Sequence, residues 1–176
     1  FAAGPTEAHP WFPGIRKPFA NAFGCRAAVL HPKSRGHVKL ASADPREKLR
    51  LHQNFFAEED DLTLLRKGVR MAREFLSQPS LTPFRGEEIS PGAAVTDDEG
   101  IDAYIRRSCI TVHHPLGTCR MGSDSDSVVD PDLHVRGTEG LRVVDASVMP
   151  RVPRSGGAHA TVLMIGERVV DWIASA

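Results

Sequence analysis

SCITVHHPLGTCRMG (Ser108–Gly122) is the stretch around which the chain is organised, because few core segments combine two adjacent histidines, a proline and a Gly-Thr-Cys turn. Pro115 biases the residue before it, His114, toward an extended backbone. Neighbouring side chains on an extended chain point in opposite directions. We therefore expect only one of the two histidines to face a given site, and we expect His113 to point away and pack.

A second histidine-bearing stretch, SGGAHATVLMIGER (Ser155–Arg168), comes late in the chain. It predicts a helix from His159, with an apolar stripe at Val162, Ile165, Val169 and Ile173. The glycines before it can present backbone N–H groups to an anion at the helix N-terminus. A plain N-cap by Ser155 explains the same residues at least as well. We predict that His114 and His159 face one another across a shared site.

The remaining segments predict helices and strands of a mixed protein. Glu58–Gln78 is the clearest helix, with an apolar stripe and a basic side that we expect to be solvated. Thr96 and Glu99 form a capping-box signal for a helix from about Asp97 to Ser108. Two predicted strands, Ala22–His31 and His37–Ser42, form an antiparallel hairpin across a five-residue turn. A further short strand is predicted at Leu141–Val144, and Phe1–Asn21 is predicted to be irregular loop.

Composition excludes several classes of protein. The 176 residues carry 22 basic and 22 acidic side chains, so nothing favours nucleic acid or an anionic membrane. No apolar run approaches the roughly 20 residues that span a bilayer. The three cysteines make no disulfide framework, which favours a reducing compartment, and we expect a cytoplasmic location.

Two other kinds of site are disfavoured. His113, His114, Cys119 and His159 are chemically able to bind zinc, but their spacing matches no common zinc motif, and we expect no metal. A Ser–His–Asp hydrolase is disfavoured because the chain has no GxSxG motif.

The motifs, taken in order, resemble the glucose–methanol–choline (GMC) oxidoreductases, in their choline-dehydrogenase-like branch. The resemblance is carried by HHPLGTCRMG, by VVDPDLHVRGTEGLRVVDASVMPRVP (Val128–Pro153) and by the helix ending MIGER. VLHPKSRGHVKLASADP and GVRMAREFLSQPSLTPFRGEEISPG resemble the substrate-domain segment of that family. The match covers roughly Val29 to Trp172.

The resemblance implies a flavoprotein that oxidises an alcohol by hydride transfer to FAD. His114 falls on the family's catalytic histidine. His159 falls on a second active-site position that is Asn or His across the family; here the usual GN-x-N pattern reads GGAH. The implied cofactor-binding residues are Asp145 and Ala146, which close the FAD site, and Gly157, Ala158, His159 and Ala160 at the helix start beside the flavin ring.

Imidazole chemistry suits this reaction. An alcohol must lose a hydroxyl proton and a carbon-bound hydride, and a histidine can accept the proton near neutral pH. A second imidazole can hydrogen-bond the same oxygen and fix its orientation. Sequence does not decide which of the pair is the base, and we favour His114. A helix N-terminus beside the flavin would stabilise negative charge as the hydride arrives.

The expected fold is α+β. Residues 1–107 are predicted to form a substrate-binding segment with an antiparallel sheet and helices, and residues 108–176 to add a strand and a helix to an FAD-binding α/β domain. The family's GxGxxG motif does not occur in these residues, so we expect a C-terminal part of a longer enzyme, or one chain of a split one, inactive by itself.

The expected partners are a small-molecule alcohol, an electron acceptor such as oxygen or a quinone-like compound, and the missing N-terminal FAD-binding portion. Two alternatives stay open: a hydroxynitrile lyase on the same fold, and an inactive fragment or subunit that only packs against a partner. Neither the particular alcohol nor the choice between oxidase and dehydrogenase follows from the sequence.

Overall fold

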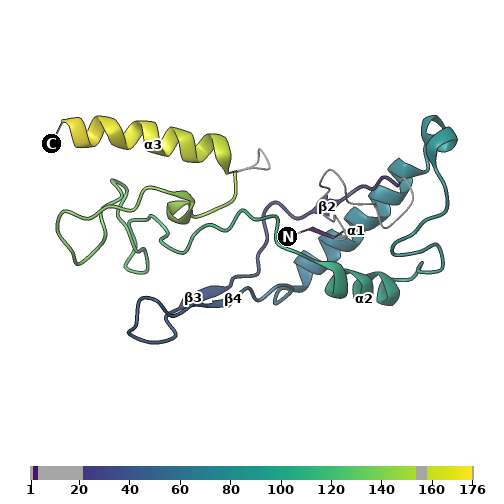
Figure 1. Ribbon diagram of the computed structural model, residues 1–176, viewed down its shortest axis with the longest axis horizontal. Coiled ribbons are helices and arrows are strands. Elements are labelled where there is room, and N and C mark those ends of the chain that lie inside the picture. The colour runs from purple at the N-terminus through teal and green to yellow at the C-terminus, as the bar shows by residue number, and fades with distance from the viewer. Residues whose placement is uncertain (1, 4–21, 154–157, 176) are drawn as a thin grey trace, which may run out of the picture. The chain divides into compact units, whose positions relative to one another are not determined.

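The computed structural model describes residues 2–3, 22–153 and 158–175. Along these residues the strands of two short sheets come first, and the helices follow them (Figure 1). Two compact units are present: the first comprises the described residues up to Ser34 with Phe55–Val112, and the second comprises Arg35–Asn54 with His113 onward. Each unit has its own apolar core. The chain is therefore a mixed α and β protein with small antiparallel sheets.

Helix α1 (Glu59–Leu76) confirms the helix predicted over Glu58–Gln78. Its first turn is acidic and its last turn carries Arg73, which suits the helix dipole at both ends. Leu62, Leu65 and Val69 are buried, as the apolar stripe predicts. They pack with Ile101, Tyr104 and Ile105 in the core of the first unit.

Helix α2 (Asp98–Ser108) lies close to its predicted position, but its cap differs from the predicted capping box. The Asp97 carboxylate accepts a hydrogen bond of 2.9 Å from the backbone N–H of Gly100. Asp97 therefore satisfies a helix-end donor that the sequence assigned to Thr96. The helix ends directly before Cys109, where the histidine-bearing stretch continues.

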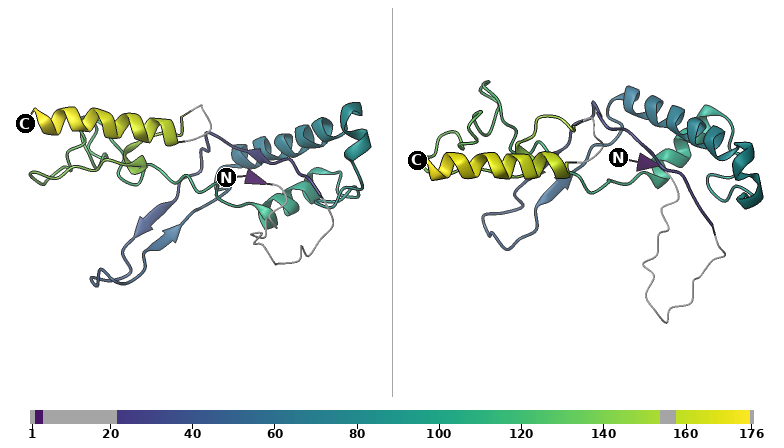
Figure 2. Two further views of the ribbon diagram at one scale, coloured as in Figure 1. Left: turned by 45° about the horizontal axis from the view of Figure 1, so that its top comes forward. Right: turned by 90° about the horizontal axis from the view of Figure 1, so that it is seen from above.

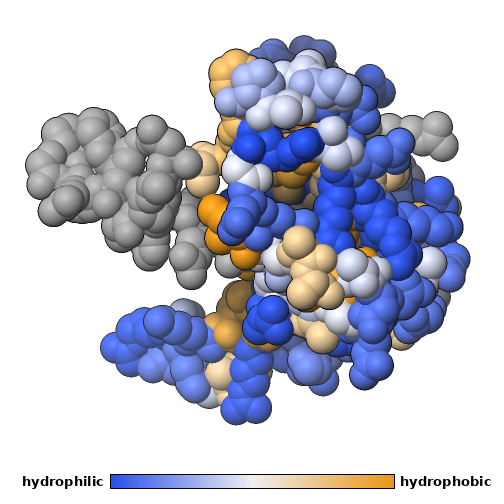
Figure 3. Space-filling model, turned by 90° about the vertical axis from the view of Figure 1, so that its right-hand side faces the viewer, coloured by the Kyte–Doolittle hydropathy of each residue, from blue (hydrophilic) through white to orange (hydrophobic). Residues whose placement is uncertain are grey.

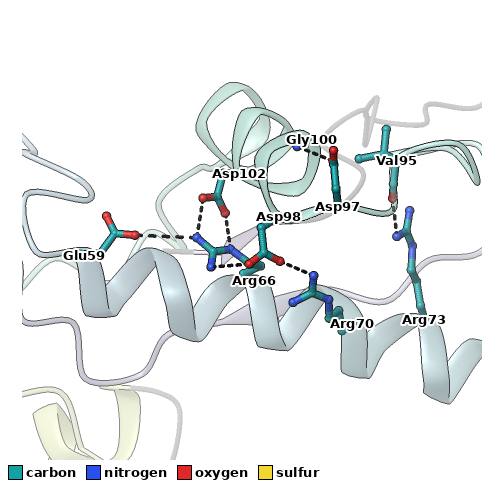
Figure 4. A network of polar contacts seen from close by, with 9 residues as sticks. All are labelled: Glu59, Arg66, Arg70, Arg73, Val95, Asp97, Asp98, Gly100 and Asp102. Atoms are coloured by element: carbon teal, nitrogen blue, oxygen red, sulfur yellow. Dashed lines mark hydrogen bonds and ion pairs between the residues drawn. The ribbon is translucent and has the colours of Figure 1, made fainter.

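The basic side of α1 is not simply solvated, contrary to the sequence-based expectation. Arg66 donates to both carboxylate oxygens of Asp102, at 2.6 and 2.5 Å, and its side chain is only 16% exposed. Arg70 pairs with Asp98 on the same helix α2 (Figure 4). Arg73 donates to the carbonyl oxygen of Val95 at 2.6 Å. The charged face of α1 thus binds α2 and the segment before it.

The predicted hairpin does not form, because each of its two strands pairs with a different strand. Strand β3 (His37–Lys39) pairs with β4 (Arg50–His52), across a long connection. Strand β2 (Ala27–Ala28) pairs with β1 (Ala2–Ala3), inside a segment that was predicted to be loop. The remainder of that segment, residues 1 and 4–21, lies outside the described residues. The two strands β3 and β4 run side by side, as the left view of Figure 2 shows.

A buried carboxylate explains why the turn at Pro32–Gly36 closes no hairpin. Asp61 is 0% exposed. Its two oxygens accept hydrogen bonds of 2.8 Å from the backbone N–H groups of Lys33 and Ser34. The turn is therefore tied to the first turn of α1, and the strands on either side of it find other partners.

The second unit contains more turn than strand. Isolated bridges join Met121 to Val129, Val129 to Val135, and His134 to Arg142. Leu141–Val144, predicted to be a strand, contributes only the bridge at Arg142. Two short 3-10 helices complete the described elements: η1 (Pro79–Phe84) in the first unit and η2 (Ala146–Val148) in the second.

Helix α3 (His159–Ala174) confirms the helix predicted from His159. Ile165 and Val169 are buried in the core of the second unit, and Val162 packs against it. Ile173, the fourth member of the predicted stripe, is 62% exposed. The helix therefore buries the middle of its stripe.

Side chains at the surface are mainly polar on the face drawn in Figure 3, where hydrophilic residues predominate around small apolar areas. No helix in the described part of the chain is both long and apolar enough to cross a membrane.

Candidate active site

His114 and His159 line the same hollow in the second unit, and their sharing a catalytic site stays a prediction. The hollow has a volume of about 310 Å³. It is formed by the loop His113–Pro115, the start of η2 and the first turn of α3. Its lining residues are His113, His114, Pro115, Ala146, Ala158, His159 and Val162. Both predicted catalytic histidines are exposed in this chain.

The local backbone explains how two distant segments meet. Cys119 and Met121 donate backbone hydrogen bonds of 3.0 and 2.8 Å to the carbonyl oxygens of Ser147 and Val148. These bonds hold the chain after His114 against η2. The buried side chains of Val148 and Ala158 belong to one apolar core. The core therefore connects the segments that carry the two histidines.

His113 also lines the hollow, which corrects the expectation that it points away and packs. Its φ is 61°, in the left-handed region. The alternation of side chains holds for an extended strand, and a left-handed residue breaks it. Histidine adopts this region several-fold more often than most residues. Sequence reasoning missed His113 because nothing in the spacing signals a left-handed residue before His114.

The start of α3 differs from the predicted alternative of a Ser155 cap. The N-cap residue is Ala158, and none of the described side chains makes a capping hydrogen bond to the helix. A methyl group cannot accept one, so this residue leaves the first backbone N–H groups of α3 without a side-chain acceptor of its own. Such an end favours negative charge nearby. Ser155 and Gly157 lie outside the described residues.

The described residues predicted to bind the cofactor, other than His159, divide into three groups. Ala146 and Ala158 line the hollow beside the two histidines. Asp145 uses its carboxylate to cap η2, accepting hydrogen bonds of 2.7 Å from the backbone N–H and 2.5 Å from the hydroxyl of Ser147. Ala160 is exposed on the first turn of α3 and is not among the lining residues. Contact of any of these residues with a cofactor stays a prediction.

Metal ligands do not gather in the described residues. No group of three or more His, Cys, Asp or Glu side chains there is placed to hold a metal ion. Cys119, which is chemically able to bind zinc, is a half-buried free thiol.

The family model of the GMC oxidoreductases matches residues 32–166. The chain therefore belongs to the GMC oxidoreductase family, as the ordered motifs implied. His114, His159 and the start of α3 therefore belong to a chain of an oxidoreductase family.

Particular relatives agree with this assignment. An oxygen-dependent choline dehydrogenase from Cronobacter sakazakii is 44% identical over 154 residues, which make up 88% of this chain and 27% of that protein. A pyridoxine 4-oxidase from Mesorbium loti has a TM-score of 0.78 and 35% identity, over 84% of this chain and 28% of that one. The chain spans little more than a quarter of the length of these relatives.

A third relative has a similar fold, and the description of its structure names FAD. A formate oxidase from Aspergillus oryzae, in a structure that concerns FAD modification, has a TM-score of 0.83 at 29% identity. It matches over 92% of this chain and 29% of its own. The mixed fold of helices and a small antiparallel sheet is therefore that of GMC oxidoreductases.

Proposed function

We propose that this chain supplies the substrate-facing histidines of an FAD-dependent alcohol oxidoreductase. The observation that carries the proposal is that His114 and His159, from segments far apart in sequence, line one hollow at the start of α3. The family supports the reaction class. The assignment of residues 1–107 to a substrate-binding segment and of residues 108–176 to the FAD-binding domain is part of the same proposal.

The residues around the hollow suit a flat ring system. Ala146, Ala158 and Pro115 are small or compact, so they leave room beside the imidazoles. The uncapped start of α3 favours the negative charge that a reduced flavin carries. Ala146, Ala158 and the first turn of α3 would hold the cofactor, with Asp145 supporting Ala146 through its cap of η2. FAD would supply the hydride acceptor for the alcohol.

The two histidines have distinct proposed roles. His114 accepts the hydroxyl proton of the substrate, because a histidine takes up a proton near neutral pH. His159 donates or accepts a hydrogen bond at the same oxygen and fixes its orientation. The small side chains around them exclude bulk water once a substrate fills the hollow. The electron acceptor, oxygen or a quinone-like compound, and the cytoplasmic location stay predictions.

Replacing His114 tests the proposal in the FAD-loaded enzyme that contains this chain. Loss of the base in His114→Ala should slow anaerobic flavin reduction by alcohols about 10²- to 10⁴-fold, the usual contribution of a positioned general base. Bound FAD should remain, as its visible absorbance would show. His31→Ala is the matched control, because His31 is exposed in the first unit and does not line the hollow.

Two results would contradict the proposal. Flavin reduction that stays fast in His114→Ala removes His114 from the chemistry. Cleavage of a cyanohydrin without any flavin reduction by alcohols assigns the site to a lyase.

A further inference from the structure

Two histidines meet across the sheet that β3 and β4 form, and neither of them lines the hollow described above. His37 and His52 are directly opposite in the antiparallel register, so their side chains leave the same face of the sheet. Their ring centres are 4.9 Å apart, and the ring planes make an angle of 63°. Both residues are exposed in this chain. Strand pairing therefore brings together two imidazoles that local sequence does not connect.

The backbone holds the two strands close together at the end that carries the histidines. A Cβ at Gly36 would lie 2.1 Å from the carbonyl oxygen of His52, so a residue with a side chain does not fit there. The side-chain amide of Asn54 donates a hydrogen bond of 3.0 Å to the carbonyl oxygen of Arg35. Both contacts join one strand to the other. Only the two imidazoles therefore need to turn to share a ligand.

The spacing of the rings suits one shared metal ion. Zinc binds an imidazole nitrogen at about 2.0–2.1 Å, and the ring centre lies about 1.1 Å beyond that nitrogen, which places the ion about 3.2 Å from each ring centre. Two rings that meet at the ion with an angle of about 90–110° then have centres about 4.5–5.2 Å apart. The observed 4.9 Å lies in this range. The terminal torsion of histidine is soft, so the rings can turn their nitrogens toward the ion.

We propose that His37 and His52 bind one divalent late transition metal ion, of the class of Zn²⁺ and Ni²⁺, which joins β3 to β4. Imidazole is a preferred ligand of these ions. Water completes the coordination, so the pair is smaller than the groups of three or more ligands that the described residues do not form. The inference does not depend on the proposed function, because it concerns other residues.

Such an ion stabilises a sheet that has little else to hold it. Two strands alone are marginally stable in water. The next directly opposite pair is Lys39 and Arg50, and like charges in this position destabilise a sheet. An ion held by both strands closes the loop of residues 40–49 and stabilises the paired state according to its occupancy. Lys39 and Arg50 also repel the ion, but both are exposed, and salt screens their charges.

Calorimetric titration of the metal-free, FAD-loaded enzyme with Zn²⁺ or Ni²⁺ tests the site. The hollow carries imidazoles of its own, so substitutions must assign the binding to β3 and β4. His37→Gln and His52→Gln should each raise the Kd of this site at least about tenfold, because one imidazole cannot chelate. His31→Gln is the matched control, since His31 is exposed in the first unit. Mg²⁺ prefers oxygen ligands and should not bind there.

Hydrogen exchange locates the ion on the chain. At a metal concentration ten times the Kd, peptides from β3 and β4 should exchange about tenfold more slowly, as linkage between binding and opening requires. Peptides from α1, in the other unit, are the internal control. Lys39→Gln keeps both ligands and removes a repelling charge, so it should bind the ion about twofold more tightly at low salt.

The results that overturn the inference are distinct. Metal binding and exchange of β3 and β4 that are the same in both histidine variants as in the wild type would mean an aromatic contact only. If His37→Gln and His52→Gln open the sheet without metal, Lys39→Gln decides: tighter binding supports the site, and unchanged or weaker binding overturns it.

The proposed function fails or stands separately. Flavin reduction by alcohols in an enzyme that binds no ion at His37 overturns the inference alone. Metal binding that His37→Gln removes, in an enzyme whose flavin no alcohol reduces, supports the inference and contradicts the proposed function.

Discussion

Changing Asp61 to asparagine should loosen the first unit, because Asp61 is a buried carboxylate with two backbone donors. Its side chain is 0% exposed, and it accepts hydrogen bonds of 2.8 Å from the N–H groups of Lys33 and Ser34. Asparagine keeps one acceptor oxygen and replaces the other with an NH₂ group. One of the two N–H groups then faces a donor, and the other bonds to a neutral oxygen.

The size of the effect follows from these two bonds. A hydrogen bond to a charged group contributes about 1.5–3 kcal/mol, and a neutral one about 1 kcal/mol. Losing one charged bond and weakening the other should cost about 2–3 kcal/mol. Because 1.4 kcal/mol is a factor of ten, amide protection in α1 should fall roughly 30- to 150-fold.

Hydrogen exchange measured by mass spectrometry on the full chain suits this prediction, since it reports local opening in each segment. Peptides from α1 and from the turn at Lys33 should exchange faster in Asp61→Asn. Peptides from α3, in the other unit, serve as the internal control.

The neighbouring residue offers a matched substitution. Asp60 pairs with the Lys33 ammonium at the surface, where its side chain is 63% exposed. Exposed ion pairs contribute little, so Asp60→Asn should leave the protection of α1 nearly unchanged. Equal effects of the two substitutions, or unchanged α1 protection in Asp61→Asn, would refute the assignment of the effect to the buried carboxylate.

Two further predictions use the same readouts. Substitution of Gly68 and of Gly166 by alanine should have opposite effects. A Cβ at Gly68 would lie 2.7 Å from the Ala27 Cβ, so Gly68→Ala should lower the amide protection of α1. A Cβ at Gly166 meets nothing within 4 Å, so Gly166→Ala should raise the protection of α3 roughly fivefold, through about 1 kcal/mol of helix propensity. Lower protection in Gly166→Ala would contradict this reasoning. The Arg70 guanidinium lowers the pKa of Asp98 in the folded protein. The ionised carboxylate therefore stabilises the fold at pH values above its unfolded pKa of about 4. This contribution is lost as the pH falls through the lower folded pKa. The difference in urea midpoint between wild type and Asp98→Asn should therefore be present at neutral pH and vanish in strong acid; a difference that persists there would count against the ion pair.

Local patterns predicted the helices well. The stripe of α1 and the start of α3 were read correctly, because helical hydrogen bonds join residues four apart and the apolar spacing follows directly. The motif around His114 predicted that it would share a site with His159, and both line one hollow. Their contact with FAD and their roles in chemistry stay predictions.

Strand pairing could not be read from local patterns. The sequence around Pro32–Gly36 satisfies the rules for a hairpin turn, but the strands choose their partners over long distances. The buried Asp61 carboxylate decides the outcome by binding the turn to α1. The basic side of α1 was misjudged for a similar reason, since only the fold brings Arg66 to Asp102.

By itself, the sequence determined the helices and the family, and it predicted the two histidines expected to act. Each of these depends on residues close together in the chain or on an ordered set of motifs. Only the tertiary structure decided the strand partners, the buried acceptor at Asp61 and the place of His113. These depend on contacts between distant segments and, at His113, on one left-handed backbone angle that redirects a side chain. The histidine that the alternation rule assigned to packing is therefore part of the candidate site.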